Sequence, residues 1–558
     1  MNQDKHTKKR IRSTYGVNKR IRTSVNVDDL LVAKCENGSF VGREREGVLI
    51  YRGIPYAKPP VKDRRWKRPE PPEPDDGMYE AYYNGNSPIQ TEWPTEVASY
   101  YPQSEDCLYL NVWTSPTETS SGKAVMVFFH GGSYGWGGTA DPLYDGFNFV
   151  DRHRDIVLVT VGYRTGLFGF VDLSRLPGGA EYFDSPNLGI LDQIESLRWV
   201  QKNITAFGGN PDNVTIFGES AGGGSVSLLP VIEEAKGLFK RVIAESGSVA
   251  LTFSKKECAA FTEKLLKYTE VSSVQELVNL PTSDLIEINE VLNAYNNFPQ
   301  RNGHFIPFNP LKAYAGGMTK DIDMIHGTNA NETNYWIGEI GGLVPYRYGM
   351  HVKFENDIRA MSPENKSRVK RFLKTRKDLS LWKITEFYNE MMFRIPAIKQ
   401  VENHTKCGGR AYMYYWNMPS TVPFRKSCHA VELAYVFRNR AETIYTGMPA
   451  DEKLSDMVSD MWAEFAKTGH PGIPGVPWKQ YGKDRQTMVF SDKPKMHKVL
   501  EKQRRILSLL PDFKINPSYA DLDVNVPFVY KIAANIAIVI GLLCVLLKAL
   551  HDLKRDDD

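Results

Sequence analysis

The stretch NVTIFGESAGGG (213–224) joins an apolar strand pattern to the start of a helix rich in small residues. Between them stands G-x-S-x-G, with Gly218, Ser220 and Gly222. In a sharp strand-to-helix turn the serine has a strained backbone, and side chains two residues before or after it would collide. The helix that follows directs its N-terminal N–H groups at the same point, which favours negative charge there. The motif predicts that Ser220 is a nucleophile; a simple tight turn is the alternative.

Apolar strand patterns and helical patterns alternate outward from this motif. The predicted strands are almost continuously hydrophobic, which is typical of strands buried on both faces, and they cover residues 124–130, 155–164, 213–218, 241–246, 321–327 and 411–417. Apolar residues recur at helical spacing over 191–204 and 454–465, and Gly469 and Pro471 favour an end to the second helix. We therefore predict an α/β-hydrolase fold, with a mostly parallel central sheet and helices on both faces, over residues 27–512.

A serine hydroxyl is a weak nucleophile and needs a base that a third group holds in place. In this fold the partners follow in the order serine, acid, histidine, each on a loop after a strand. Glu332 follows the predicted strand at 321–327, and His429 follows the one at 411–417. Spacing favours these two residues, while the histidines that remain as alternatives are His351, His404, His470, His497 and His551.

Ester chemistry at a serine also needs donors for the developing oxyanion. The run FFHGGSYGWGG (128–138) leaves a strand and turns through glycines, which lets backbone N–H groups face that charge. We expect the donors to be Gly132, Ser133 and Ala221. A flexible turn is the alternative.

Several further motifs point to one family, and they are FGGNPDNVTIFGESAGG (207–223), SEDCLYLNVW (104–113), RGIPYAKPP (52–60), RRWKRPEP (64–71), ADPLYDG (140–146), NLGILDQ (187–193) and CHAVELAYVF (428–437). With them the chain resembles the type-B carboxylesterase and cholinesterase family, most closely its bacterial para-nitrobenzyl-esterase-like members, over about residues 30–510. The resemblance implies the triad and oxyanion hole given above. It also implies a structural ion pair, Arg65–Glu105, near the site, and a polar shell of Glu219 and Ser246 behind the nucleophile.

The chain departs from the family pattern at two points. Ser133 replaces the usual third glycine of the oxyanion loop, which alters the pocket but keeps the backbone donor. Cys107 and Cys258 lack the partners with which secreted relatives form disulfides. The six cysteines also form no CxxC or Cys/His metal pattern, so we expect mostly free thiols and no metal or cofactor.

The ends of the chain differ from its middle. Residues 1–22 hold eight Lys or Arg against one acid, and we predict a disordered basic arm over 1–26, with adhesion to anionic lipid as the alternative. The net charge of +4 does not indicate a nucleic-acid partner. No apolar segment of a signal peptide follows the basic start.

The sequence IAANIAIVIGLLCVLL (532–547) is an uncharged run between two lysines. Crossing a bilayer takes about 20 residues, and the flanking lysines can extend to the surface. We predict a linker over 513–531, a transmembrane anchor over 532–550 and a charged tail over 551–558, with the catalytic domain in the cytoplasm. A helix docked on the enzyme is the alternative.

Together these features predict a membrane-anchored serine esterase. We expect a Ser-His-Glu triad to hydrolyse small to medium apolar esters through a covalent acyl-enzyme. One alternative is a membrane-tethered, non-catalytic interaction protein on the same scaffold. Another is a lipase or thioesterase that uses the same triad.

Overall fold

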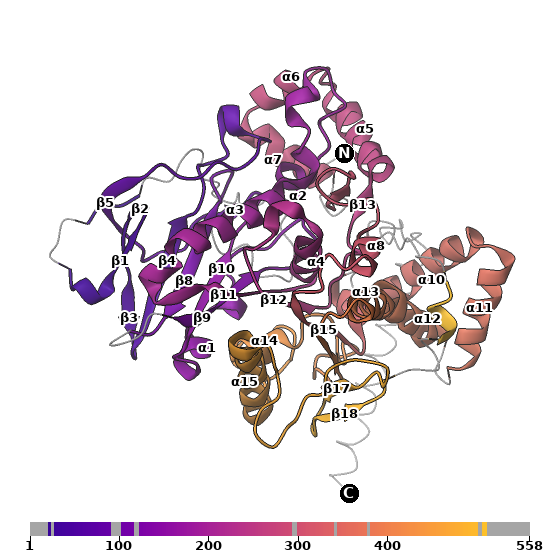
Figure 1. Ribbon diagram of the computed structural model, residues 1–558. Coiled ribbons are helices and arrows are strands. Elements are labelled where there is room, and N and C mark those ends of the chain that lie inside the picture. The colour runs from indigo at the N-terminus through magenta and orange to yellow at the C-terminus, as the bar shows by residue number, and fades with distance from the viewer. Residues whose placement is uncertain are drawn as a thin grey trace, which may run out of the picture.

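The computed structural model describes residues 20–23, 27–90, 102–116, 122–292, 298–339, 343–376, 380–499 and 505–510. Its central feature is an eleven-stranded sheet with helices packed on both faces (Figure 1). Across the sheet the strands follow the order β18 (Lys495–His497), β17 (Thr487–Phe490), β16 (Ala411–Trp416), β15 (Asp323–Asn329), β12 (Arg241–Glu245), β11 (Gly209–Glu219), β9 (Lys123–Phe129), β10 (Ile156–Val161), β8 (Tyr109–Thr114), β4 (Val48–Pro55) and β3 (Arg43–Arg45).

The seven strands from β17 to β10 pair in parallel, and antiparallel strands flank them at both edges. All six strands predicted from apolar runs lie in this parallel part. On β9, Val125 and Val127 join one hydrophobic cluster, and Met126 and Phe128 join the other. Alternate side chains of a strand point to opposite faces, so the sheet is buried on both sides. The prediction of a mostly parallel sheet between two helical layers is confirmed.

The helices form two layers and two projecting lobes. Helices α3 and α4 pack on the face of Val125, and α15 packs on the face of Phe128. Figure 1 shows α5–α7 as a lobe at the top and α10–α12 as a lobe at the right. The helices are α1 (Phe147–Arg152), α2 (Gly166–Phe170), α3 (Leu188–Asn203), α4 (Ala221–Leu228), α5 (Lys255–Thr269), α6 (Val274–Asn279), α7 (Thr282–Val291), α8 (Pro310–Ala315), α9 (Trp336–Glu339), α10 (Leu343–Arg359), α11 (Pro363–Lys374), α12 (Ser380–Tyr388), α13 (Ile395–Lys406), α14 (Leu433–Val436) and α15 (Glu452–Thr468).

Small elements complete the fold. Three short sheets consist of β1 (Val32–Cys35) with β2 (Asn37–Val41) and β5 (Asp75–Glu80), of β6 (Ser87–Pro88) with β7 (Gln103–Ser104), and of β13 (Phe253–Ser254) with β14 (Gln300–Arg301). A π-helix, Asn389–Arg394, joins α12 to α13. π-Helical segments are rare in proteins, and those that occur often lie at functional sites.

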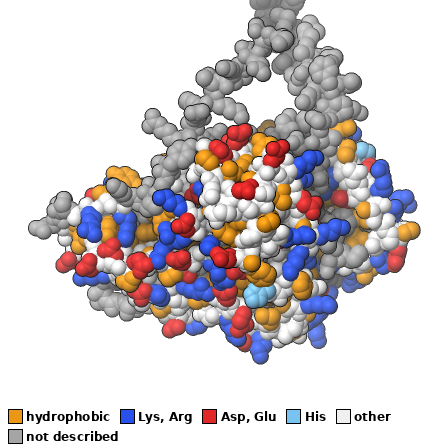
Figure 2. Space-filling view, turned by 90° about the horizontal axis from the view of Figure 1, so that it is seen from above, with side chains coloured by type: hydrophobic (Ala, Val, Ile, Leu, Met, Phe, Trp, Pro, Cys, Tyr) orange, Lys and Arg blue, Asp and Glu red, His pale blue; other side chains and the backbone are white. Residues whose placement is uncertain are grey.

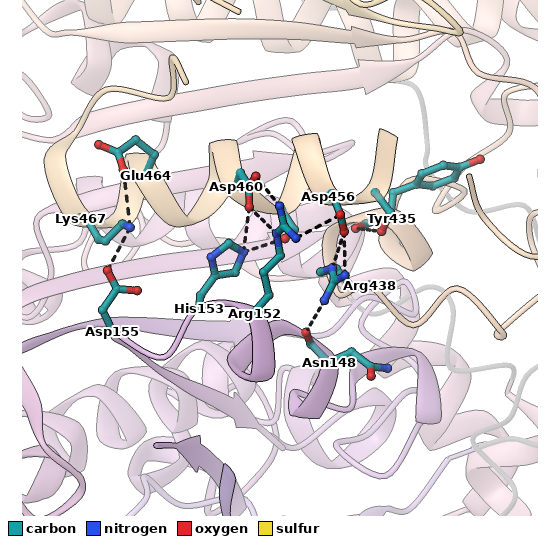
Figure 3. Close-up of polar contacts among 12 residues, drawn as sticks. Asn148, Arg152, His153, Asp155, Tyr435, Arg438, Asp456, Asp460, Glu464 and Lys467 are labelled. Carbon is teal, nitrogen blue, oxygen red and sulfur yellow. Dashed lines mark hydrogen bonds and ion pairs between the residues drawn. The ribbon is translucent and has the colours of Figure 1, made fainter. Parts of the chain in front are cut away.

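Ion pairs fix the outer side of α15 to α1 and to the start of β10 (Figure 3). Arg152 lies 2.6 Å from Asp460 and 3.0 Å from Asp456, and Lys467 lies 3.0 Å from Asp155. These groups are part-exposed, so each pair contributes about 0–1 kcal/mol. The apolar face of α15, with Val458, Met461 and Phe465 buried in the core, contributes more to its packing. On the face in Figure 2, acidic and basic side chains are interspersed, with no extended region of one sign.

The chain ends lie mostly outside the described residues. At the end of the predicted basic arm, residues 20–23 run beside β5, where Glu80 N–H donates to Ile21 O at 2.9 Å and Thr23 N–H donates to Met78 O at 3.1 Å. The predicted linker, anchor and tail after residue 512 are outside. Within the described ranges, no helix combines the length and the apolar character that crossing a bilayer requires. The cysteines described are all free thiols, and they are Cys35, Cys107, Cys258, Cys407 and Cys428.

Candidate active site

Ser220 occupies a strained turn between β11 and α4. Its backbone has φ 57° and ψ −118°, a conformation that L residues rarely adopt, and it is the N-cap residue of α4. Two hydrogen bonds fix the turn: Ser220 N–H donates to Glu245 O at 2.8 Å, and Gly224 N–H donates to Ser220 O at 2.8 Å. The hydrogen bond to Glu245 on the neighbouring strand β12 therefore helps to hold Ser220 in its strained backbone conformation. The side chain lines a cavity above the sheet.

The glycines of the motif are required by close backbone contacts. A Cβ atom on Gly218 would lie 2.6 Å from Phe129 O, and one on Gly222 would lie 1.9 Å from the same atom. Both distances are far below ordinary contact. The end of β9 is therefore pressed against the turn, and a side chain at either glycine would separate them.

Glu332 and His429 come together at the carboxyl ends of β15 and β16. Glu332 begins the turn after β15, and His429 lies in the loop after β16. His429 Nδ1 lies 2.7 Å from Glu332 Oε2, and His429 N–H donates to Glu332 O at 3.3 Å. Because a carboxylate only accepts, Nδ1 carries the proton, and Nε2 of the neutral ring is then an acceptor.

The other ring nitrogen faces Glu219. His429 Nε2 lies 3.2 Å from Glu219 Oε1, and among the described residues it makes no hydrogen bond of normal geometry. Glu219 precedes Ser220 and is buried. Glu219, Ser220 and His429 line one small cavity together. The arrangement puts a carboxylate beside the imidazole edge at which a cation would form during proton transfer.

Glu332 is held by two further donors. Ser246 Oγ–H donates to Glu332 Oε1 at 2.7 Å, and Asn329 N–H donates to the same oxygen at 2.6 Å. Asn329 Nδ2–H also donates to a second buried acid, Glu432, at 2.5 Å. Burial, and then the nearby Glu332 carboxylate, raise the pKa of Glu432 to about 7. The resemblance pointed to Ser246. It assigned no role to Asn329, or to Glu432, although Glu432 lies within the motif CHAVELAYVF (428–437).

The loop after β9 turns toward the serine. Gly132, Ser133 and Tyr134 have φ of 99°, 51° and 59°, and Trp136 N–H donates to Gly132 O at 3.0 Å. Ser133 and Ser220 line the same cavities. Ala221 is the first residue of α4, so its N–H has no acceptor within the helix. All three expected oxyanion donors therefore lie on segments next to Ser220.

Arg65 and Glu105 form a buried, two-pronged ion pair. Arg65 Nε and Nη2 each lie 2.6 Å from a Glu105 oxygen, and Arg65 Nη1–H donates to Val278 O at 2.6 Å. Both residues line a separate small cavity that does not include Ser220. The pair fixes the segment before β8 to the lobe of α6, and it touches no candidate catalytic group.

Two cavities meet at Ser220. The small one contains His429 and Glu219, and the large one is lined by residues of β13, β14, α8 and the π-helix. Both share Ser133 and Trp336. The π-helix places Met391, Met392 and Phe393 on the wall of the large cavity.

Aromatic side chains form part of the walls of both cavities. Trp336 lines both cavities, and Trp136 and Tyr335 line the small one. Phe308 is 66% exposed, and neither cavity includes it. The sequence did not indicate that the methionines of the π-helix line a cavity, because apolar residues before a helix normally belong to the hydrophobic core.

Comparison with known proteins gives a consistent result. The family model that matches is described as the Carboxylesterase family, and the match covers residues 29–506. The chain is similar to the para-nitrobenzyl esterase of Bacillus subtilis (strain 168), with 32% identity over 85% of this chain and 97% of that protein. It is also similar to the human (Homo sapiens) cocaine esterase, with 30% identity over 82% of this chain and 86% of that protein. Among solved structures, the carboxylesterase EST55 of Geobacillus stearothermophilus has a TM-score of 0.76 and 31% identity, over 85% of this chain and 99% of that one.

Proposed function

Since the chain belongs to the carboxylesterase family and is therefore an ester-hydrolysing serine enzyme, we propose that Ser220, His429 and Glu332 are its catalytic triad. The observation that carries this proposal is the 2.7 Å contact between His429 Nδ1 and Glu332 Oε2, on the same small cavity as Ser220. It leaves Nε2 as the basic nitrogen. Catalytic hydrogen bonds often tighten only when substrate binds, and we expect Ser220 Oγ to engage Nε2 in the substrate complex.

The proposed reaction has two steps. Ser220 Oγ attacks the ester carbonyl while His429 Nε2 takes its proton, and the N–H groups of Gly132, Ser133 and Ala221 stabilise the oxyanion. The imidazolium then protonates the departing alkoxide, which leaves an acyl-enzyme. In the second step His429 takes a proton from water, the hydroxide attacks the acyl carbon, and Ser220 recovers its proton as the acid leaves.

The two cavities support an assignment of the substrate halves. The nitrogen that protonates the leaving oxygen must lie beside the alcohol, and His429 lines the small cavity only. We therefore place the alcohol in the small cavity and the acyl group in the large one. The apolar wall of Phe298, Trp336 and Met391 favours small to medium apolar acyl groups. A lipid ester or thioester would use the same groups and differs only in fit.

Replacement of the nucleophile tests this proposal. Ser220→Ala should lower kcat on a nitrophenyl ester by about 10⁴ or more. Ser227→Ala is the matched control, because Ser227 lies on the same helix and its buried hydroxyl has no hydrogen-bond partner among the described residues. A fluorophosphonate probe should label the wild type and Ser227→Ala but not Ser220→Ala. Wild-type turnover in Ser220→Ala would refute the assignment.

Family membership and esterase relatives set aside the non-catalytic alternative. The supporting shell, the basic arm and the domain boundaries from residue 27 to 512 remain part of this proposal. The anchor over 532–550 and a cytoplasmic catalytic domain remain predictions from the sequence.

A further inference from the structure

The large cavity beside Ser220 is apolar in its interior and charged at one part of its wall. Ala221, Phe298 and Met391 are buried there. The charged lining residues are Glu257, Arg301 and Lys399, and all three are half-buried. Glu257 lies on α5, Arg301 on β14 and Lys399 on α13. Figure 1 shows β13, which pairs with β14, followed by α8 and α13 along the same side of the sheet. Part-exposed charges next to a buried apolar wall mark the part of the cavity that meets solvent.

Arg301 is held on a rigid backbone. It follows Gln300 on β14, which pairs with β13. Gln300 N–H donates to Asn187 Oδ1 at 2.8 Å, and Gln300 Nε2–H donates to Asp172 Oδ2 at 2.7 Å. Because neighbouring residues of a strand point in opposite directions, anchoring Gln300 inward directs Arg301 to the cavity side. The guanidinium is therefore presented from a fixed base.

In the part of the chain that the structure describes, the guanidinium of Arg301 has no acidic partner. Among the described residues, no carboxylate lies within 4.0 Å of it, and its one hydrogen bond is a long one, from Nη1 to Phe308 O at 3.4 Å. Its Nε is shielded from solvent and has no acceptor within the described ranges. A shielded donor without a partner is unfavourable, and arginine is the side chain best shaped to bind a carboxylate with two parallel hydrogen bonds.

The other two charges of the wall are already engaged. Glu257 Oε2 accepts from the N–H of Ser254 at 2.7 Å and from its hydroxyl at 2.5 Å, as part of the N-cap of α5. Lys399 Nζ–H donates to Leu510 O at 3.4 Å. Of the three, Arg301 has the most unused hydrogen-bonding capacity, because among the described residues its Nε has no acceptor and its guanidinium makes only one long hydrogen bond.

We propose that Arg301 binds a carboxylate at the far end of the acyl chain, so that the enzyme prefers monoesters of dicarboxylic acids over neutral esters of the same length. This inference rests on the proposed function, in which the acyl group occupies the large cavity. The apolar wall binds the methylene chain, and the guanidinium binds the terminal charge. Because the backbone at Gln300 is fixed and the Arg301 side chain has a limited reach, the preference should be strongest over a narrow range of acyl chain lengths.

The test is a ratio of rates. For each acyl length, kcat/KM is measured for the nitrophenyl monoester of a dicarboxylic acid and for the neutral nitrophenyl ester of matching length. The ratio of the two cancels any loss that affects both substrates. In Arg301→Met the ratio at the best chain length should fall by about 10- to 100-fold, the range for a hydrogen bond to a charged group. Arg301→Lys keeps the charge but loses the planar fork of donors, so its ratio should lie between that of wild type and that of Arg301→Met.

Lys399→Met is the matched control, because it removes the same charge from the same cavity. The site predicts a change of less than about 3-fold there, since a screened charge without direct contact contributes little. An equal fall of the ratio in Lys399→Met and Arg301→Met would overturn the proposed site, because it would indicate a general electrostatic effect of positive charge in the cavity. An unchanged ratio in Arg301→Met would also overturn it. If wild type hydrolyses the neutral esters and shows no preference for the acid, the inference fails while the triad stands. If Ser220→Ala hydrolyses both, the triad itself fails.

Discussion

Replacing Gly222 with alanine puts a methyl group against the end of β9. The added carbon would lie 1.9 Å from Phe129 O, 2.8 Å from Phe129 C and 2.9 Å from His130 O. Ordinary contact requires about 3.4 Å or more, so the two backbones must separate by about 1.5 Å. Backbone atoms cannot rotate away as a side chain can. The movement must therefore pass into β9 and the oxyanion loop, which begins three residues later.

The size of the effect follows from that displacement. A catalytic group misplaced by about 1 Å costs roughly 10²-fold in rate, and overpacking a dense interior costs about 1–3 kcal/mol of stability. We expect Gly222→Ala to lower kcat/KM on a neutral nitrophenyl ester by about 10²- to 10³-fold. Thermal unfolding separates this loss from a failure to fold, and the rate of fluorophosphonate labelling reports the oxyanion hole directly.

Gly224→Ala is the matched control on the same helix. Its added carbon would meet only side-chain atoms, at 2.8 Å from Tyr134 Oη and 3.1 Å from Leu251 Cδ1. Side chains can give way, so we expect less than about a 10-fold loss. A folded Gly222→Ala enzyme with activity within about 3-fold of wild type would refute the argument that the glycine positions the loop.

Two further predictions concern stability. Arg65→Met leaves the carboxylate of Glu105 buried without its ion-pair partner, and should lower the free energy of unfolding, measured in urea, by about 3–5 kcal/mol. Adding Glu105→Gln to this variant should recover part of the loss. No recovery would show that the ion pair is not the cause. The second prediction concerns His326, whose pKa burial lowers to about 3 from an ordinary 6.5. Between pH 6.5 and pH 3 the unfolded chain takes up a proton at this residue and the folded chain does not, so the free energy of unfolding decreases as the pH decreases. His326→Gln should lose that component, and its stability relative to wild type should rise by about 2–3 kcal/mol between pH 7 and pH 4.5; parallel stability curves for the two proteins would contradict this.

The sequence was most informative where the chemistry is local. The turn at Ser220 was predictable because glycine at both flanking positions is a steric requirement within five residues. The strands were predictable because burial on both faces demands continuous apolar runs. The resemblance then assigned Glu332 and His429, which spacing had left among several candidates.

The sequence was least informative where contacts join distant segments. Asn329 links the carboxylates of Glu332 and Glu432, which lie 100 residues apart, and no pattern marks either link. Phe308 is aromatic, a type that favours burial, but the structure exposes it. The π-helix that forms the wall of the large cavity cannot be distinguished from an α-helix by apolar spacing.

The amino-acid sequence by itself determined the layered fold, the identity of the strained serine and the order in which its proposed partners appear. Those properties depend on local sterics and on hydrophobic period, which are written along the chain. Only the tertiary structure decided which carboxylate faces which edge of His429, and that Arg301 lies on the wall of the large cavity with no acidic partner among the described residues. These properties depend on the distances between side chains from different strands and helices, and such distances exist only once the sheet has brought the segments together.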